Sequence, residues 1–466
     1  MIEYASNGHS QAALVIGAGI AGIQAAIDIA DAGFKVYLVE RSPSIGGRMS
    51  QLDKTFPTLD CSSCILTPKM VDVSRHPNIE LLTYSEVAEV HGEMGGFQVR
   101  IKKKPRYVDE DKCRGCGLCA QACRLSGRVT GDPFVDHNAG VARRAAIYVP
   151  FPQAVPLIYT VDPQACIYLT RGVCGKTFLC KDACDAQAID FTQTETYLDV
   201  NVDTIVVATG FDIFDAHRRP EMGYGVYPQV INTLEFERLA SASGPTSGKI
   251  ILDGKTPKQI VFIHCVGSRD RALGRWDDQG TNPYCSRVCC MAVAKQAHLA
   301  HDRIPGAEIT VFYMDVRAFG KGFEEFYDRV RNEGILYRRG NPSEIIRKGE
   351  KLLVRAEDTL LGELVELEAD LVVLAVGMQP RRDASNVAEM LDLERSEDGF
   401  FLEDHPKLRT VESNIPGVFL AGCCQGPKDI PDTVAHAKAA ASAAMILLAR
   451  NRQPLFASQE HSSLLA

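Results

Sequence analysis

The feature that most constrains the fold of this chain is a glycine-rich turn near its N-terminal end. A short apolar run leads into the sequence GAGIAG at residues 17–22, and a second apolar run ends at Glu40. In this G-x-G-x-x-G pattern, Gly17 permits a tight turn, Gly19 lets the backbone approach a pyrophosphate, and Gly22 lets the next helix pack on a sheet. Glu40 stands where an acid accepts hydrogen bonds from ribose hydroxyls. The sequence therefore predicts a strand–helix–strand unit that binds a dinucleotide.

Further segments indicate that this dinucleotide is FAD. The pair Gly46-Gly47 follows Glu40 closely, as it does in flavoproteins built from two dinucleotide-binding folds. Residues 204–210 and 371–377 each read as a strand that ends in glycine, the form that marks the two crossings between the domains of such flavoproteins. Residues 417–422 resemble a second FAD fingerprint, which lies beside the ribityl chain.

One position in that fingerprint departs from the pattern. Cys423 stands where an aspartate normally binds the ribityl chain, so Asp429 or Asp432 is a candidate to replace it. The residues that we expect to bind FAD are Gly17, Gly19, Ile20, Ala21, Gly22, Glu40, Arg41, Gly47, Arg48, Ala208, Thr209, Gly210, Gly422, Cys423, Asp432 and Thr433.

The central part of the chain predicts a second dinucleotide fold that lacks the usual nicotinamide site. Its first strand is expected at residues 259–263, and the segment 264–270 that follows has one glycine and no G-x-G-x-x-G. The sequence thus argues against NAD(P)H binding in the usual mode. The predicted division is an FAD domain at 1–105, 195–250 and 378–466, an inserted domain at 106–194 and a second dinucleotide fold at 251–377.

The predicted insertion carries cysteines at the spacing of an iron–sulfur protein. Cys113, Cys116, Cys119 and Cys123 form C-x2-C-x2-C-x3-C, the bacterial ferredoxin run, although Arg124 follows where proline is usual. Zinc and a cluster-free remnant are the alternatives. The fourth cysteine of such a run ligates the other of two clusters. We therefore expect one set made of Cys113, Cys116, Cys119 and Cys184, and another made of Cys123, Cys166, Cys174 and Cys180.

The other cysteines leave several interpretations open. Cys265 follows the strand at 259–263, and Cys285, Cys289 and Cys290 lie at what looks like the start of a helix; together they are cluster ligands or buried thiols. Cys61 and Cys64 form C-x-x-C, which fits cluster ligands, a redox dithiol or an inert pair. The adjacent Cys423 and Cys424 are expected to be inert.

Composition sets the compartment and excludes some partners. The 16 cysteines fall in groups, which in a reducing cytoplasm indicates metal or redox sites, and residues 1–11 lack a secretory leader. No apolar run approaches the roughly 20 residues of a membrane span. With a net charge of -8, the chain has no dominant basic face for nucleic acid. We expect a cytoplasmic protein without a membrane span.

Several of these segments together resemble one known family, the A subunits of heterodisulfide reductases. The segments that carry the resemblance cover nearly the whole chain: residues 47–58, the ferredoxin-like insertion, 265–270, 282–290 and 426–431. The resemblance implies a thioredoxin-reductase-like core that binds FAD. It also implies that a [4Fe–4S] cluster on Cys265, Cys285, Cys289 and Cys290 replaces the nicotinamide site, and that Lys295 lies near flavin N5 as the catalytic residue.

The resemblance also implies a function. The extra N- and C-terminal domains of the methanogen protein have no counterpart here, so the chain is more similar to the short A subunit of the heterodisulfide-reductase-like complex of sulfur oxidisers. We expect a homodimeric oxidoreductase subunit with FAD and one to three [4Fe–4S] clusters, which passes electrons to and from B- and C-type subunits. The alternative is a stand-alone NAD(P)H-dependent disulfide or polysulfide reductase that uses the Cys61/Cys64 dithiol.

Overall fold

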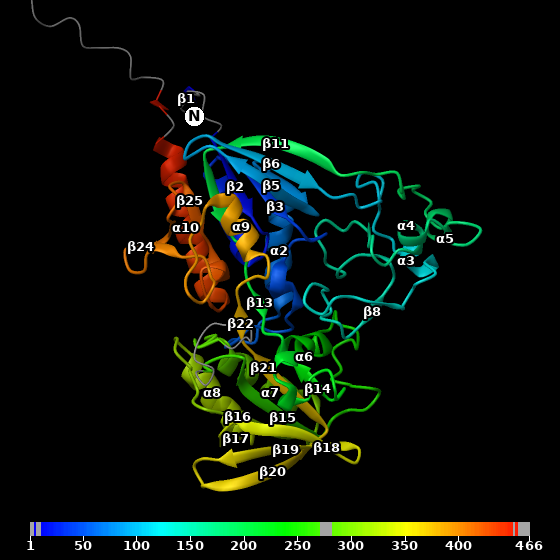
Figure 1. Cartoon of the computed structure of the whole chain (residues 1–466), viewed down its shortest axis with the longest axis vertical. Helices are drawn as coiled ribbons and strands as arrows, with labels where there is room; N and C mark the ends of the chain where they lie inside the picture. Colours follow the sequence, from blue (N-terminus) through cyan, green and yellow to red (C-terminus); the bar gives the residue numbers. More distant parts are fainter. Residues whose placement is uncertain (1–3, 6–10, 271–281, 451–452, 455–466) are drawn as a thin grey trace, which may run out of the picture.

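A computed structural model describes residues 4–5, 11–270, 282–450 and 453–454 of the chain. Figure 1 shows three regions: a large α/β domain at the top, a loop-rich region in cyan and green at its side, and a second α/β domain below. In the part of the chain that the structure describes, no helix is long and apolar enough to cross a membrane. The predicted α/β fold class with two dinucleotide folds and an insertion is confirmed.

The upper domain is built on a seven-stranded sheet. Its core strands are parallel and apolar, as expected of strands that are buried on both faces. Helices α1 (Ile20–Asp31), α2 (Ser62–Arg75) and α10 (Ile430–Arg450) cover one face. The strand order is β23 (Glu403–His405), β24 (Arg409–Ser413), β25 (Val418–Leu420), β12 (Thr204–Val207), β2 (Ala12–Ile16), β3 (Lys35–Glu40) and β4 (Ile79–Thr83).

A small antiparallel sheet covers the opposite face of the large one. Its strands are β5 (Ser85–His91), β6 (Phe97–Lys103) and β11 (Thr196–Val202), and helix α9 (Ala384–Leu391) packs beside them. Lys103 at the end of β6 pairs with Thr196 at the start of β11. The loop-rich region leaves the sheet and returns to it between these two residues.

This inserted region contains only short elements around its own small core. They are α3 (Leu118–Ala122), β7 (Val129–Thr130), β8 (Arg143–Arg144), β9 (Ile147–Tyr148), β10 (Thr160–Val161), α4 (Ile167–Arg171) and α5 (Leu179–Asp182). The buried Arg106 ties the region to the upper domain, since its guanidinium donates to the Pro43 carbonyl, to Thr83 Oγ1 and to Thr160 Oγ1 at 2.6–2.9 Å.

The lower domain has a five-stranded parallel sheet between helices and a second small sheet. The strand order is β14 (Val230–Asn232), β21 (Leu371–Val376), β15 (Gln259–Val266), β16 (Glu308–Tyr313) and β17 (Leu336–Arg339). Helices α6 (Thr233–Ala240), α7 (Cys289–Arg303) and α8 (Phe323–Asn332) lie on one face. The antiparallel strands β18 (Pro342–Lys348), β19 (Lys351–Asp358) and β20 (Glu363–Ala369) lie on the other.

Two short strands carry the chain between the domains. They are β13 (Asp212–Ile213) and β22 (Met378–Gln379), which pair antiparallel directly after the strand-and-glycine segments predicted to be crossings. The remaining short elements are η1 (Gly47–Gln51), η2 (Ala216–Arg218), η3 (Pro220–Met222) and η4 (Gly422–Cys424), and the pair β1 (Tyr4–Ala5) and β26 (Gln453–Pro454).

Candidate flavin and iron–sulfur sites

The glycine-rich turn lies between β2 and α1, at the carboxyl end of the large sheet. Gly17 has a positive φ of 97°, and a Cβ on it would lie 2.5 Å from the Ala208 carbonyl oxygen. A Cβ on Gly22 would lie 1.8 Å from the Gly17 carbonyl oxygen. Gly19 is the N-cap of α1, so the positive end of that helix faces the turn. These are the physical requirements of a pyrophosphate site at a helix N-terminus.

Glu40 closes this turn from the end of β3. One carboxylate oxygen accepts the backbone N–H of Ala18 and the other accepts that of Ser42, each at 2.8 Å. The carboxylate is therefore held beside the turn, where the sequence predicts that it meets the ribose.

The segment after β12 contributes a polar atom that has no partner. Thr209 Oγ1 is buried without a hydrogen bond, and nothing lies within 4 Å of the position that a Cβ on Gly210 would take. A Cβ on Gly422 would lie 2.7 Å from the Ala21 methyl group, so η4 packs closely on the start of α1. The open glycine cradle and the unpaired hydroxyl fit a bound dinucleotide such as FAD.

Two predicted arginines bind protein carboxylates in this structure. Arg41 pairs with Asp383, and Arg48 lies 3.2 Å from Asp212 and also donates to the Phe134 carbonyl of the insertion. Burial lowers the pKa of Arg48. These contacts bring the insertion onto the loop that follows Gly47.

The residues expected near the ribityl chain form a small cluster at the start of α10. Cys423 Sγ lies 3.5 Å from Thr433 Oγ1, and burial raises the pKa of that thiol. Asp432 accepts a hydrogen bond from Arg287 at 3.0 Å, which links α10 to the segment before α7. No sequence pattern points to His436, whose Nδ1 accepts the Gly422 N–H at 3.0 Å.

Lys295 is buried in α7 and forms an ion pair with Glu237 of α6 at 2.6 Å. Its ammonium also donates to the Lys54 carbonyl at 2.8 Å. Glu237 was not predicted as a site residue, because a lone acid in a helix looks like a surface residue until its distant partner is known.

The insertion brings its eight cysteines together in two groups. Burial raises the pKa of Cys119 to about 12, and the neighbouring thiols of Cys113, Cys184 and Cys116 raise it further. Burial likewise raises the pKa of Cys180 to about 11, with Cys123, Cys166 and Cys174 as its neighbours. These groups have the same members as the two sets expected from the cross-ligation rule.

The second group lines a cavity of the insertion. Cys123, Cys166, Cys174 and Cys180 are among its lining residues, together with apolar side chains such as Phe178. Within the described ranges, no three His, Cys, Asp or Glu side chains converge on the position of a single metal ion. A cubane holds its thiolates at separate corners, so a group of thiols around a cavity fits a cluster better than it fits zinc.

A third group of thiols lies at the carboxyl end of β15. Burial raises the pKa of Cys265 to about 12, and Cys290 and Cys285 are the neighbouring thiols that add to the shift. Burial also raises the pKa of Cys289, with the same three thiols around it. The lower domain therefore brings together all four cysteines that the resemblance assigns to a cluster.

Backbone strain accompanies this third group. Cys265 and Arg287 have positive φ values of 59° and 63°, which side chains other than glycine rarely adopt. Helix α7 begins at Cys289, so the expectation that Cys285 lies on the same helix start is wrong: the left-handed Arg287 separates them. A Cβ on Gly267 would lie 2.2 Å from the Phe214 ring, so the loop after β15 packs on an aromatic side chain and offers no glycine cradle.

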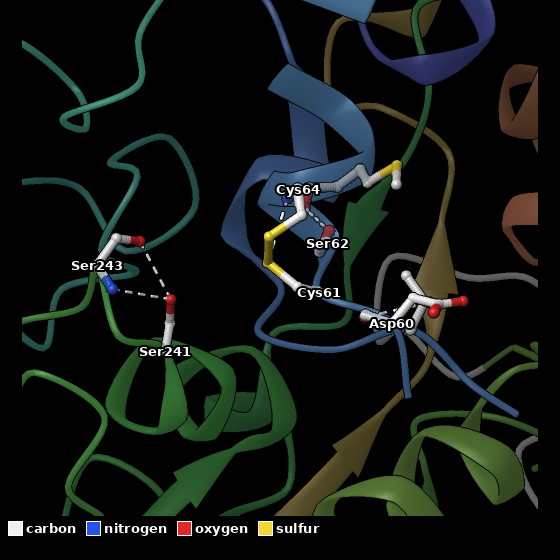
Figure 2. Close-up of a disulfide and its surroundings, with 8 residues drawn as sticks. Asp60, Cys61, Ser62, Cys64, Ser241 and Ser243 are labelled. Atoms are coloured by element: carbon white, nitrogen blue, oxygen red, sulfur yellow. Dashed lines mark hydrogen bonds between the residues drawn. A yellow bond between two sulfur atoms is a disulfide. The ribbon is translucent and has the colours of Figure 1, made fainter. Parts of the chain in front are cut away.

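Cys61 and Cys64 are joined by a disulfide at the first turn of α2, as Figure 2 shows. Between them, Ser62 Oγ donates to the Met49 carbonyl at 2.6 Å. The pair therefore sits on η1, directly after the glycine pair of the predicted phosphate site.

Three family models match parts of the chain. Residues 13–59 match a FAD-dependent oxidoreductase model, residues 106–124 match a 4Fe–4S binding domain, and residues 288–442 match a pyridine nucleotide-disulphide oxidoreductase model. The predicted cofactors, FAD and [4Fe–4S], agree with these matches.

Two curated relatives match almost the whole chain. One of the iron-sulfur A subunits of CoB–CoM heterodisulfide reductase from Methanopyrus kandleri, numbered 2, is 55% identical over 94% of this chain and 64% of its own length. The A subunit of H(2):CoB-CoM heterodisulfide,ferredoxin reductase from Methanothermobacter marburgensis is 52% identical over 93% of this chain and 63% of its own length. The chain thus spans less than two thirds of the relatives it matches.

A solved structure supports the fold. The crystal structure of T. acidophilum thioredoxin reductase superposes with a TM-score of 0.50 at 14% identity, and the match covers 95% of this chain and 99% of that one. At this identity the likeness shows a thioredoxin-reductase-like fold alone.

Proposed function

We propose, because this chain is a homologue of heterodisulfide reductase A subunits over nearly its whole length, that it is the FAD and [4Fe–4S] electron-transfer subunit of an oxidoreductase in sulfur metabolism. The observation that carries the proposal is the convergence of twelve cysteines into three groups of four thiols around one predicted flavin site.

FAD would bind along the glycine turn and Glu40, with Thr209 free to donate to it. The proposed contacts also include the other residues predicted for the cofactor, from Arg41 and Arg48 to Cys423, Asp432 and Thr433. When bound, FAD allows exchange between two-electron and one-electron chemistry. The contribution of the chain is to hold the cofactor away from water and to fix Lys295 through its ion pair with Glu237.

The cysteine groups would hold the clusters. We assign Cys113, Cys116, Cys119 and Cys184 to one cluster, Cys123, Cys166, Cys174 and Cys180 to a second, and Cys265, Cys285, Cys289 and Cys290 to a third. The third group occupies the end of β15, where a reductase of this fold binds its nicotinamide, so electrons would enter or leave there as single electrons. The FAD domain, insertion and second fold keep the bounds predicted from the sequence.

The partners follow from the same homology. We propose that the chain works in a heterodisulfide-reductase-like complex of the sulfur-oxidiser type, as a homodimer in the cytoplasm with B- and C-type subunits that bind the sulfur substrate.

The test is the iron and acid-labile sulfide per flavin in anaerobically purified protein, with the low-temperature paramagnetic spectrum of the reduced form. About twelve irons per flavin would fill all three groups, and about four would fill one. Protein with neither flavin nor iron after anaerobic purification would refute the proposal.

A further inference from the structure

The Cys61–Cys64 disulfide has no role in the electron relay proposed above, yet its two sulfurs differ in accessibility. Cys64 is exposed on the first turn of α2, whereas Cys61 is half-buried at the N-cap. A molecule arriving from solvent therefore meets the Cys64 sulfur first.

The two sulfurs also differ in how well they carry a negative charge. Cys61 Sγ accepts the backbone N–H of Cys64 at 3.2 Å and caps α2. The positive end of a helix favours a thiolate at this position, and a thiolate that is stabilised leaves a disulfide faster. Attack on Cys64 would thus release the sulfur that is best able to leave.

The disulfide is connected to both halves of the predicted flavin site. Cys61 forms an isolated antiparallel bridge with Lys54, and the Lys54 carbonyl accepts the Lys295 ammonium at 2.8 Å. Ser62 Oγ donates to the Met49 carbonyl of η1. The first residue of η1, Gly47, lies against Gly19, because a Cβ on Gly47 would lie 2.8 Å from the Gly19 Cα.

We propose that Cys61 and Cys64 form a thiol–disulfide exchange site for small soluble thiols, and that the pair passes two electrons from those thiols to the flavin. The inference rests on the flavin site of the proposed function and adds to it a substrate class and an entry point for electrons.

The chemistry balances as follows. A thiolate attacks Cys64 Sγ, which forms a mixed disulfide and breaks the Cys61–Cys64 bond, and the electron pair stays on Cys61 Sγ. A second thiolate attacks the outer sulfur of the mixed disulfide, which releases the small disulfide and leaves Cys64 as a thiolate. The two protein thiolates then re-form their bond by giving two electrons to oxidised FAD, which takes up one proton.

The coupling to flavin is tested by anaerobic dithionite titration of the holoprotein. Wild type should take up two more electrons per chain than the double variant Cys61→Ser, Cys64→Ser, with the same iron and flavin content. Serine is itself a good N-cap, so the variant keeps the cap of α2. The control Ser63→Ala, between the two cysteines, should titrate like wild type.

The exchange step has its own test, which does not need flavin. In the single variants, the remaining cysteine is treated with the disulfide of 2-mercaptoethanol, and the mixed disulfide is measured by mass spectrometry. Exposed Cys64 in Cys61→Ser should react about tenfold faster than half-buried Cys61 in Cys64→Ser, as access controls exchange.

Three results would overturn the inference. They are equal electron uptake by wild type and the double variant, loss of iron from the double variant, which would make the pair cluster ligands, and equal or reversed rates for the single variants. Protein without flavin and iron would refute the proposed function, while the mass measurement would still decide whether exchange occurs.

Discussion

The Lys295 ammonium lies 2.6 Å from the Glu237 carboxylate, and each side chain is at most 3% exposed. Glu237 also accepts the Gln296 amide and the Asp53 backbone N–H, so a single carboxylate joins α6, α7 and the loop after η1. A charge pair removed from water in this way is tolerated only when its remaining hydrogen bonds are satisfied.

Glu237→Gln should destabilise the protein strongly. The change leaves the Lys295 ammonium buried without a counter-charge, which costs roughly 3 to 5 kcal/mol in the free energy of unfolding. Denaturant unfolding followed by circular dichroism measures this. The matched control is Glu350→Gln, because the pair of Glu350 with Lys255 is exposed and should matter little. A loss as small in Glu237→Gln as in the control would contradict the structural role of the pair.

Gly17→Ala should abolish FAD binding. The backbone of Gly17 has a φ of 97°, and the new methyl group would overlap the Ala208 carbonyl at 2.5 Å, so the turn must open. Flavin per chain, read from the visible spectrum after purification, should fall to a small fraction of the wild-type ratio. Gly96→Ala is the control, since no atom lies within 4 Å of its Cβ and its φ is not positive. Full flavin content in Gly17→Ala would argue against this turn as the pyrophosphate site.

Exchange of one cysteine in the insertion should remove one cluster and leave the others. Cys180→Ser takes a thiol from the cavity group, and Cys184→Ser takes one from the group around Cys119. Each variant should lose about four irons per chain but lose different paramagnetic signals. Cys424→Ala serves as control, because its thiol is buried against the Val207 carbonyl outside these groups. The same signal lost in both variants would contradict the two ligand sets.

Acid should loosen the flavin site through His436. Burial lowers the pKa of His436 from 6.5 to about 4, and the neutral ring accepts the Gly422 N–H. The unfolded chain therefore binds more protons than the folded one between these values, and the stability that the neutral ring contributes above pH 6.5 is lost as the pH falls towards 4.

The variant His436→Asn tests this directly, because its amide oxygen can accept the same N–H and does not titrate. Between pH 6.5 and 4, the melting temperature of the variant should fall less steeply than that of wild type, and flavin release should follow the melting temperature. Parallel curves for the two proteins would show that His436 does not carry the pH dependence.

Local patterns were enough to predict the skeleton of the flavin domain. The apolar run into the glycine turn, the helix after it and the strand that ends at Glu40 correspond to β2, α1 and β3, since each depends on residues close in sequence. The start of α7 was misplaced, because nothing in the residue types around Arg287 announces a positive φ.

Contacts between distant residues were beyond the sequence. Glu237 meets Lys295, and His436 meets Gly422, only after the sheets and helices have packed. The two cysteine sets of the insertion were predictable because the cross-ligation rule already encodes a tertiary arrangement. The bond between Cys61 and Cys64 was one of three open interpretations, and the state of a C-x-x-C pair depends on its surroundings as well as on its spacing.

The pairing of Lys103 with Thr196 has a consequence for how such a chain can evolve. Because the β6–β11 ladder continues without a break up to the point where the insertion leaves, the flavin domain closes its sheet whatever length of chain lies between. The cysteine-bearing unit is in this sense an exchangeable cassette on a hairpin. A shorter turn or another electron carrier grafted there would have to replace the anchoring contacts of Arg106 and Arg48, and little else of the flavin domain would change.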